Sequence, residues 1–515
     1  MASPWLGALR AIAAALLLAA PAPLAADESR PLWLAVTTPQ LAEALGPLAQ
    51  LRRSQGLDVL ISTDPPAQAI ARAPRRPKCL LLVGDDQAGC ETQPWFVGSG
   101  RIQRYRWRAE QAKEFASDVA IADSNADAMP EFSVGRIPAR TRQEAAAIVG
   151  KIIRYESMPP PAEPRLVAWL GAPMYGPAVD ALATNLALAT LTAHAPDWLG
   201  AWIVSADPQH RLCGRPAEQS SAFARHLREA ALGVFIGHGS VLSIVSMRRG
   251  DEMVGLPASG VPTLFDGLEP CPPVVLLACH CGNFSSNSTS LAEALLSQPG
   301  GPVAVMAATT ESHPLTNYYS AVGLLDQLHR SPPRLSTLWF GAQVRARTLH
   351  HPMVDALLLE VEGKLGNLID QASLRRDQLL MYALLGDPAT VLKLPQPMPL
   401  EVRRQTDGWH WRASPPAGSH VVHVGLRTQA PRFEPLDGSA DDDARRAAME
   451  QANAQLDFSP VEHPVAGACE GVVAQPGILR VVARSPDGAT HVGTARLIGS
   501  TSAPAEQGGM AEALP

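Results

Sequence analysis

Short apolar runs alternate with helix-patterned segments over most of the chain. The apolar runs predict buried strands at 31–38, 78–86, 165–172, 232–239, 272–279 and 301–308. Segments with helical spacing of apolar residues lie between or after these runs, at 40–55, 141–157, 177–194, 288–297 and 335–350. Alternation of this kind predicts a mostly parallel sheet with helices on both faces, and therefore an α/β fold class.

A proline-rich stretch, ESMPPPAEPR at 156–165, divides this pattern in two. Such segments are stiff and interrupt helices, so we interpret it as a linker. We expect an N-terminal α/β subdomain over residues 27–160 and a larger one over 161–395, both mostly parallel.

Beyond residue 395, single apolar residues alternate with single polar residues. The segment EVRRQTDGWHWRA (401–413) alternates around an Asp407-Gly408 turn, and 419–428 and 477–497 continue in the same style. These patterns predict antiparallel hairpins of a small all-β sandwich over residues 396–500. Residues 441–456 predict a helical insert or a charged connection. The Gly-, Ala- and Glu-rich residues 501–515 predict a disordered tail.

The N-terminus has the pattern of a secretory signal. Arg10 precedes an apolar run at 11–20, and small residues and prolines follow up to Asp27. This order predicts a signal peptide over residues 1–26, with cleavage after Ala26. The run is too short to span a bilayer, which needs roughly 20 residues, and the alternative of a buried first helix lacks a polar face. We expect export to the periplasm or the medium, with no membrane span in the mature chain.

Composition narrows the class of protein without defining its function. The 515 residues carry 43 Lys+Arg and 49 Asp+Glu, a net charge of −6, which gives no general electrostatic case for nucleic acid binding. Hydrophobic residues make up 46%, enough for a sizeable core, and seven cysteines are too few for a disulfide scaffold. Because seven is odd, at least one thiol stays unpaired in an oxidising compartment.

Two motifs stand at the carboxyl ends of predicted strands, where open α/β sheets place their sites. In VFIGHGS, His238 lies between two glycines, and in VVLLACHCGNF, Cys279 leaves the strand before a turn that Gly282 permits. An imidazole can take the proton of a thiol, whose thiolate then attacks an acyl carbon, and the imidazolium protonates the leaving group. The pair therefore indicates acyl-transfer chemistry.

Other interpretations of these residues stay open. A cysteine or a histidine at such a position can simply be a buried core residue. The cluster of Cys279, His280 and Cys281 also suggests zinc, but the sequence shows no second pair of ligands at zinc-site spacing.

A third segment precedes the predicted linker. Asp123, Asn125 and Asp127 alternate as in a calcium loop, but Ala128 stands where an EF-hand needs glycine. The alternative is a solvated turn. Calcium is thus an optional structural ion, and no cofactor is required by the chemistry above. Glu131 follows, and its carboxylate could orient the histidine as the third member of a triad.

Four blocks of the sequence resemble the gingipain-like cysteine peptidases, family C25, over about residues 31–395. They are DSNADAMPEFSVGRIPARTRQEAAAIVGKIIRYE, VFIGHGS, LLACHCGNF followed by SLAEALL and GGPVAVMAATT, and LLGDPATVLKLP. The resemblance implies that His238 and Cys279, rather than Cys281, are the catalytic pair and that Glu131 assists the histidine. It also implies an oxyanion hole from the backbone N–H groups of Gly239 and Cys279. The implied fold is caspase-like, with two α/β subdomains followed by an immunoglobulin-like domain.

The sequence departs from that family where the substrate would bind. The segment VLSIVSMRRG after the GHGS block has no tryptophan, and TTESHPL has His313 and Pro314 where arginine-specific members have one. Arginine or lysine specificity is therefore not carried over, and the substrate-binding residues are left open. We expect an exported cysteine endopeptidase acting on polypeptides. The alternatives are a sorting-type transpeptidase, which resolves the acyl-enzyme with an amine, and a catalytically inactive peptidase-like binding protein.

Overall fold

The predicted signal peptide, residues 1–26, and the predicted tail, residues 501–515, lie outside the residues that the structure describes. This computed structural model describes residues 30–498, except 162, 362–368, 429–430, 434, 438–439 and 462–468. Within these ranges, none of the helices combines the length and the apolar character needed to cross a membrane.

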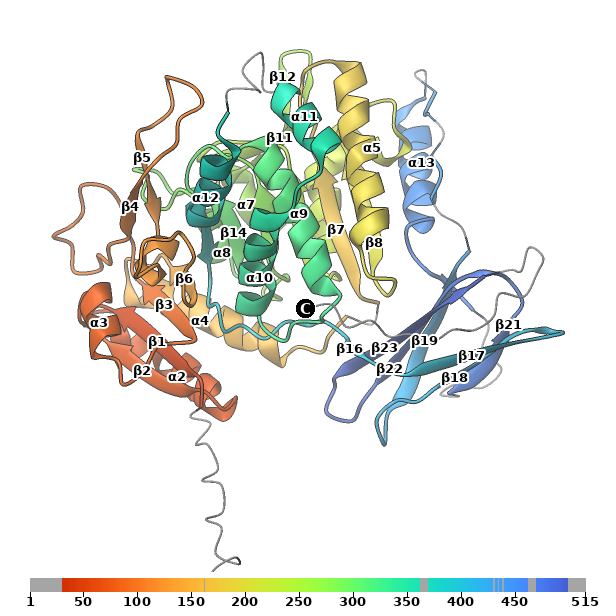
Figure 1. Ribbon diagram of the computed structural model, residues 1–515, viewed down its shortest axis with the longest axis horizontal. Coiled ribbons are helices and arrows are strands. Elements are labelled where there is room, and N and C mark those ends of the chain that lie inside the picture. Colours follow the sequence, from red (N-terminus) through yellow and green to blue (C-terminus); the bar gives the residue numbers. More distant parts are fainter. Residues whose placement is uncertain are drawn as a thin grey trace, which may run out of the picture.

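A ten-stranded sheet forms the centre of the molecule, in the order β2-β1-β3-β6-β15-β14-β13-β9-β7-β8 (Figure 1). Its strands are β1 (Leu32–Thr37), β2 (Asp58–Ser62), β3 (Cys79–Val83), β6 (Ser133–Ile137), β7 (Arg165–Leu170), β8 (Gly200–Ser205), β9 (Leu232–Ile236), β13 (Val274–Leu277), β14 (Val305–Ala308) and β15 (Tyr382–Leu385). Every residue of β1, β3, β13, β14 and β15 is buried, as expected of strands covered on both faces. The predicted mostly parallel α/β sheet is confirmed.

Strands from both predicted α/β subdomains share this one sheet. The five strands from β2 to β15 run parallel to one another, and so do the five from β14 to β8. The two groups run in opposite directions, because β14 and β15 pair antiparallel. Consequently, the carboxyl ends of β9 and β13 lie at the same edge of the sheet as the amino end of β6.

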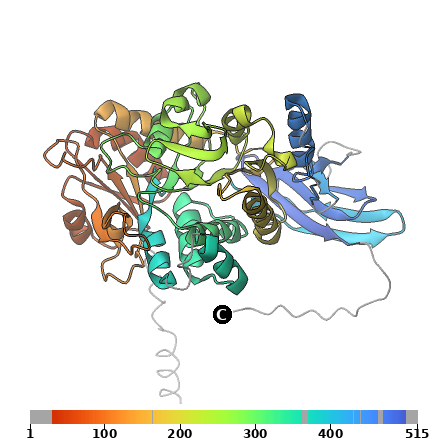
Figure 2. The same cartoon turned by 90° about the horizontal axis from the view of Figure 1, so that it is seen from above.

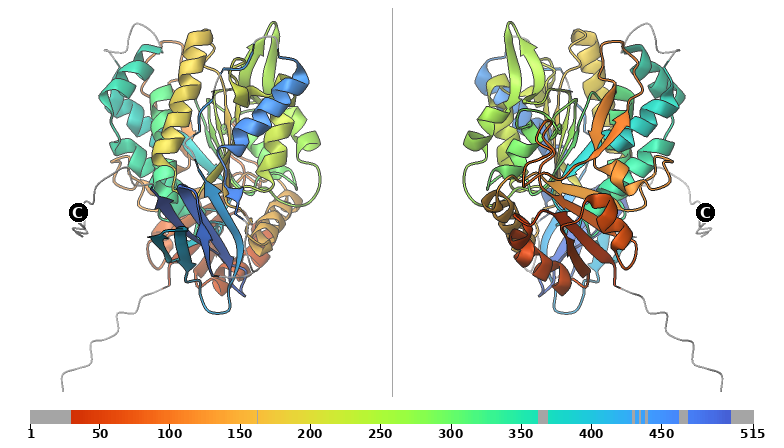
Figure 3. Two further views of the ribbon diagram at one scale, coloured as in Figure 1. Left: turned by 90° about the vertical axis from the view of Figure 1, so that its right-hand side faces the viewer. Right: turned by 90° about the vertical axis from the view of Figure 1, so that its left-hand side faces the viewer.

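Helices cover both faces of the sheet (Figure 3). One layer contains α3 (Pro66–Arg72), α5 (Pro177–His194), α9 (Pro314–Leu328), α10 (Leu335–Thr348), α11 (Pro352–Val361) and α12 (Gln371–Met381). The other contains α2 (Gly46–Ser54), α4 (Arg142–Ser157), α6 (Gln219–Leu227), α7 (Val261–Leu264) and α8 (Leu291–Ser297). Capping boxes set two of the starts: Thr141 with Glu144 begins α4, and Ser290 with Glu293 begins α8.

Two smaller sheets follow the α/β region in the sequence and lie beside it (Figures 1 and 2). They are ordered β16-β23-β22-β19-β20 and β17-β18-β21. Their strands are β16 (Gln396–Pro397), β17 (Leu400–Gln405), β18 (Gly408–Ala413), β19 (His420–Arg427), β20 (Ser459–Pro460), β21 (Glu470–Val473), β22 (Gly477–Arg484) and β23 (Thr490–Leu497). Trp411, Leu479 and Val481 belong to the apolar cluster that these strands share. The hairpins predicted at 401–413 and 477–497 are confirmed.

The predicted helical insert is α13 (Asp442–Ala454), and it packs against the large sheet. Ala452 and Leu456 share an apolar cluster with Ala201 and Ile203 of β8, the last strand of that sheet. This segment therefore ties the C-terminal strands to the α/β region.

Two further short sheets complete the described structure. They are the hairpin of β4 (Gly100–Gln103) with β5 (Glu114–Ser117), and the three strands β10 (His238–Gly239), β11 (Ser243–Arg249) and β12 (Glu252–Pro257). Strand β10 directly follows β9, so it continues from the carboxyl edge of the large sheet.

Candidate active site

The parallel pairing of β9 with β13 brings His238 and Cys279 to equivalent positions. Ile236 pairs with Leu277 at the ends of these strands, and each candidate residue lies two positions further on. Neighbouring strands are about 4.8 Å apart. Gly239 confirms the close approach of the two segments, since a Cβ there would lie 2.6 Å from the Cys279 carbonyl oxygen and 2.5 Å from Cys281 Sγ. Only glycine fits at this position.

The Cys279 thiol lies in front of a buried polar network. Its Sγ is 3.6 Å from the Ser312 carbonyl oxygen and 3.9 Å from Ser312 Oγ. Asn317 Nδ2 donates to Ser312 Oγ at 2.8 Å, and Asn317 Oδ1 accepts from the Tyr382 hydroxyl at 2.7 Å. Because these partners are buried and mutually hydrogen-bonded, they hold the wall behind the thiol in one arrangement.

The chain turns sharply after Cys279. His280 has a φ of +60°, a left-handed conformation that is uncommon outside glycine. Its N–H donates to the Thr310 carbonyl at 2.9 Å, and its Nε2 lies 3.2 Å from Glu311 Oε1. Burial lowers the pKa of His280, and the nearby Arg104 guanidinium lowers it further. These contacts fix the turn that presents the thiol.

Arg104 reaches this turn from the N-terminal half of the chain. It follows β4, forms an ion pair with Glu311, and donates to Thr310 Oγ1 at 2.8 Å. Burial lowers the pKa of Arg104 to about 10, opposed by the Asp377 carboxylate and by the Cys279 thiolate. The guanidinium is therefore close enough to stabilise negative charge on Cys279, and sequence patterns did not single it out.

The neighbouring cysteines have different surroundings. Cys281 is fully buried, with Sγ 3.3 Å from the Cys279 carbonyl oxygen, and burial raises its pKa far above the ordinary range. Burial also raises the pKa of Cys79 and Cys271 to about 11 and that of Cys213 to about 12. Cys279 is more exposed than these four thiols.

The zinc interpretation finds no support in the geometry. His280 pairs with Glu311, whereas Cys281 Sγ lies against the backbone of Cys279 and Ser243. Within the described ranges, no three His, Cys, Asp or Glu side chains converge in a way that could hold a metal ion.

His238 is exposed at the start of β10. Its Nε2 lies 3.0 Å from the carbonyl oxygen of Pro173, in the loop after β7. If Nε2 carries the proton donated to that carbonyl, the neutral ring has its lone pair on Nδ1. The backbone thus selects the tautomer that leaves Nδ1 as the proton acceptor.

Asp180, at the beginning of α5, lies close enough to His238 for the imidazolium charge to act on its carboxylate. Burial raises the pKa of Asp180, while the N–H groups of Met174 and Tyr175 and the His238 imidazole oppose that rise. Its Oδ1 accepts from Met174 N at 2.9 Å. Sequence reasoning missed Asp180, since nothing in a helix-patterned segment indicates which first-turn carboxylate faces a distant strand end.

The structure does not bring Glu131, predicted to assist the histidine, into contact with His238. Glu131 Oε1 and Oε2 accept from the hydroxyl and the N–H of Ser124, at 2.5 and 3.1 Å. The residue precedes β6, and four strand spacings of about 4.8 Å, roughly 19 Å in all, separate β6 from β9. Glu131 and His238 therefore lie at the same ends of the strands, but too far apart for a hydrogen bond.

The candidate calcium residues bond to their own loop. Asp123 accepts from Asp127 N at 3.1 Å and from Ala128 N at 2.9 Å, and Asp127 accepts from Met129 N at 2.8 Å. Asn125 Nδ2 donates to Asp127 Oδ2 at 3.0 Å. These contacts are those of the solvated turn named as the alternative to a calcium loop.

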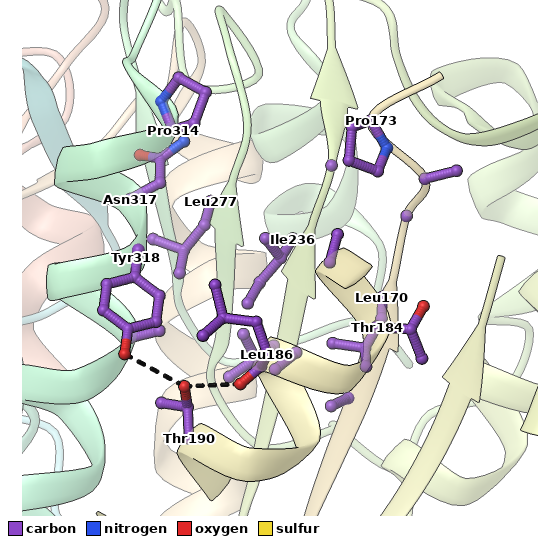
Figure 4. A pocket seen from close by; sticks show the side chains of 18 of the residues that line it. Leu170, Pro173, Thr184, Leu186, Thr190, Ile236, Leu277, Pro314, Asn317 and Tyr318 are labelled. Carbon is purple, nitrogen blue, oxygen red and sulfur yellow. Dashed lines mark hydrogen bonds between the residues drawn. The ribbon is translucent and has the colours of Figure 1, made fainter. Parts of the chain in front are cut away.

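A groove of about 260 Å³ opens at the candidate pair. His238 and Cys279 line one end, and the groove continues over β7 and β9 between α5 and α9 (Figure 4). His313 and Pro314 stand where arginine-specific family members have a tryptophan. Pro314 lines the groove, whereas His313 is buried in the core.

Comparisons with known proteins agree with this fold. The profile of peptidase family C25 matches residues 26–393, which is most of the chain. A structure described as "Structure of Protease" has a TM-score of 0.53 at 14% identity, covering 90% of this chain and 97% of its own. The Arg-specific cysteine proteinase gingipain R has a TM-score of 0.52 at 12% identity, covering 92% and 99%. No curated protein matches the sequence significantly.

These matches define the chain as a cysteine-type peptidase with a mixed α/β fold. It belongs to peptidase family C25, which confirms the resemblance drawn from the four sequence blocks.

Proposed function

We propose that the chain is an exported cysteine endopeptidase in which Cys279 is the nucleophile and His238 the general base and acid. The observation that carries the proposal is the strand register, which sets the two residues side by side at the open end of one groove. Residues 400–497 are proposed to form an immunoglobulin-like domain behind a caspase-like catalytic region.

The proposed reaction has two steps. His238 Nδ1 takes the Cys279 proton, and the thiolate attacks the scissile carbonyl while the imidazolium protonates the departing amine. His238 then takes a proton from water, which attacks the acyl-enzyme. The C–S bond breaks to release the carboxylic acid product, and the imidazolium returns its proton to the Cys279 thiolate. The N–H groups of Gly239 and Cys279 are proposed to bind the oxyanion.

The surroundings of the pair support these roles. The Pro173 carbonyl holds the ring of His238, and the Asp180 carboxylate lies near that ring. Arg104 supplies positive charge near the thiolate. Asp180 therefore replaces Glu131 as the proposed positioning carboxylate.

Export remains part of the proposal and is supported by the order of charge, apolar run and small residues over positions 1–26. The proposed destination is the periplasm or the medium. The proposed reaction needs no cofactor, and the proposed role of calcium is that of an optional structural ion at the 123–127 loop.

The test compares two variants that each remove one sulfur atom, Cys279→Ala and Cys281→Ala. We expect hydrolysis of a peptide library to fall by on the order of 10³-fold or more in the first variant. The second should retain the activity, because the Cys281 thiol is buried. Unchanged hydrolysis by Cys279→Ala would reject the proposed nucleophile.

The same assay separates the alternatives. Added amines that give only ligated product would identify a transpeptidase. A folded protein whose Cys279 stays unreactive from about pH 5 to 9 would identify an inactive relative.

A further inference from the structure

The groove beside the catalytic pair is long and apolar. Its floor includes Leu166, Ala168 and Leu170 of β7 together with Val234 and Ile236 of β9. The stretch from Leu166 to Leu170 alone extends about 13 Å. Residues of α5 form one wall, and residues of α9 and α11 form the other (Figure 4).

No Asp, Glu, Lys or Arg is among the described residues that line the groove. Its polar side chains are already engaged with the protein. Thr184 Oγ1 is 3.0 Å from Ser205 Oγ, and Thr190 Oγ1 donates to the Leu186 carbonyl at 2.7 Å and lies 3.3 Å from the Tyr318 hydroxyl. A charged group entering this space would lose its hydration without gaining a partner, which is costly.

The acidic residue near the mouth does not alter this picture. Asp180 is not among the lining residues, and its carboxylate receives the N–H groups of Met174 and Tyr175. A cationic side chain would have to displace those bonds to pair with it.

The rim exposes large apolar side chains. Tyr175 is 49% exposed and Leu182 is 47% exposed, and both line the groove. Exposed apolar surface that continues directly into an apolar groove marks a surface that a partner covers. Because this groove ends at the proposed nucleophile, the partner it fits is the substrate of that nucleophile.

We propose that the groove receives a large apolar side chain of the polypeptide substrate, adjacent to the scissile bond. The enzyme then cleaves beside leucine, methionine or phenylalanine and discriminates against arginine and lysine. This specificity rests on the proposed function, since it assigns a substrate class to the same catalytic pair.

The experiment uses the full chain and peptidyl acyloxymethyl ketones that differ only in the residue before the reactive group. Labelling of Cys279 is expected to be at least about tenfold faster with leucine or phenylalanine than with arginine, a difference of about 1.4 kcal/mol. Equal or faster labelling by the arginine probe would overturn the proposed specificity, but it would not contradict the role of Cys279 as nucleophile. If neither these probes nor iodoacetamide modifies Cys279 in the folded protein, the proposed function itself fails.

A matched pair of variants locates the effect in the groove. Ala183 lines it, whereas Ala189 is an exposed residue of the same helix outside it. Ala183→Phe should slow the leucine probe about tenfold without changing the iodoacetamide rate, and Ala189→Phe should change neither. Ala183→Asp should raise the arginine-to-leucine ratio. Equal effects of both phenylalanine variants would contradict the assignment.

A free acyl chain is the competing occupant. If decanoate protects Cys279 from iodoacetamide while the leucine and arginine probes label it equally, the groove binds lipid and the peptide assignment is overturned.

Discussion

At the scale of single residues, His313 shows how a polar side chain in the candidate site region acts through the fold. It is only 1% exposed, and its Nδ1 accepts from Leu315 N at 3.1 Å, which caps the start of α9. Its Nε2 has no hydrogen-bond partner among the described residues, and the Trp107 ring lies edge-on at 5.3 Å. Protonation of this ring would place a charge in an apolar, unpaired position.

Acid should therefore destabilise the protein through His313. Burial, with a smaller contribution from Arg108, lowers its pKa to about 4 from an unfolded value of about 6.5. The unfolded chain binds the extra proton first, so stability is complete above about pH 6.5 and falls as the pH drops towards 4. The loss should be ~3 kcal/mol, the free energy that corresponds to lowering the pKa from about 6.5 to about 4.

His313→Asn tests this because asparagine retains an acceptor for the Leu315 N–H but does not titrate. Urea unfolding at pH 7 and pH 4 should show a smaller acid loss in this variant than in the parent, by about 3 kcal/mol. The exposed His420→Asn should keep the parent's loss. An identical loss in all three proteins would contradict the role of His313.

At the scale of elements, apolar pattern and capping predict much of the fold. The helices expected at 141–157 and 177–194 match α4 and α5 almost residue for residue, helped in α4 by its capping box. The sequence does not predict strand β15. Helix α12 ends at Met381 and β15 begins at the next residue, so the apolar residues of the strand fit a continuation of the helix equally well.

The apolar pattern also could not predict the direction of each strand or its position in the sheet, because a buried strand is apolar whichever way it runs. The proposed pair of His238 and Cys279 could be put forward from the sequence because each residue follows its own strand in a recognisable motif. Glu131 could not be excluded from sequence, because the distance between β6 and β9 depends on which strands lie between them.

The contact between β10 and the turn after β13 makes Gly239 a sharp test of the site. In Gly239→Ala the new Cβ would collide with the Cys279 carbonyl oxygen at 2.6 Å, which is backbone and cannot swing aside. His238 and Cys279 should separate, and kcat/KM should fall on the order of 10²-fold, the scale of a 1 Å misplacement. Peptide hydrolysis and the alkylation rate of Cys279 measure the effect.

Gly260→Ala is the matched control, since the nearest atom to its Cβ would be 3.6 Å away. It should leave activity unchanged. If Gly239→Ala were as active as Gly260→Ala, the two motifs would not be in contact in solution.

At the scale of the whole molecule, the C-terminal segment protects an edge of the large sheet. Strand β8 ends the sheet, and an uncovered edge strand exposes N–H and C=O groups to pairing with other chains. Asn453 of α13 occupies those groups: its Oδ1 accepts from Ile203 N at 2.6 Å and its Nδ2 donates to Ile203 O at 3.0 Å. Ala201 N donates to the Leu456 carbonyl at 3.3 Å. The helix thus imitates a further strand at this edge.

Removing the Asn453 amide should therefore cost both stability and solubility. In Asn453→Ala the Ile203 N–H and C=O lose buried partners, which should lower the free energy of unfolding by about 2–3 kcal/mol. The uncovered edge should also increase aggregation near the unfolding midpoint.

Urea unfolding and light scattering measure the two effects, with Gln451→Ala on the exposed face of the same helix as control. Peptidase activity of the folded fraction should be unchanged, because β8 lies two strands from β9 and, among the described residues, Asn453 has no hydrogen bond to His238 or Cys279. Equal destabilisation by both variants would mean that α13 contributes helix stability alone, and that the edge is protected by other contacts.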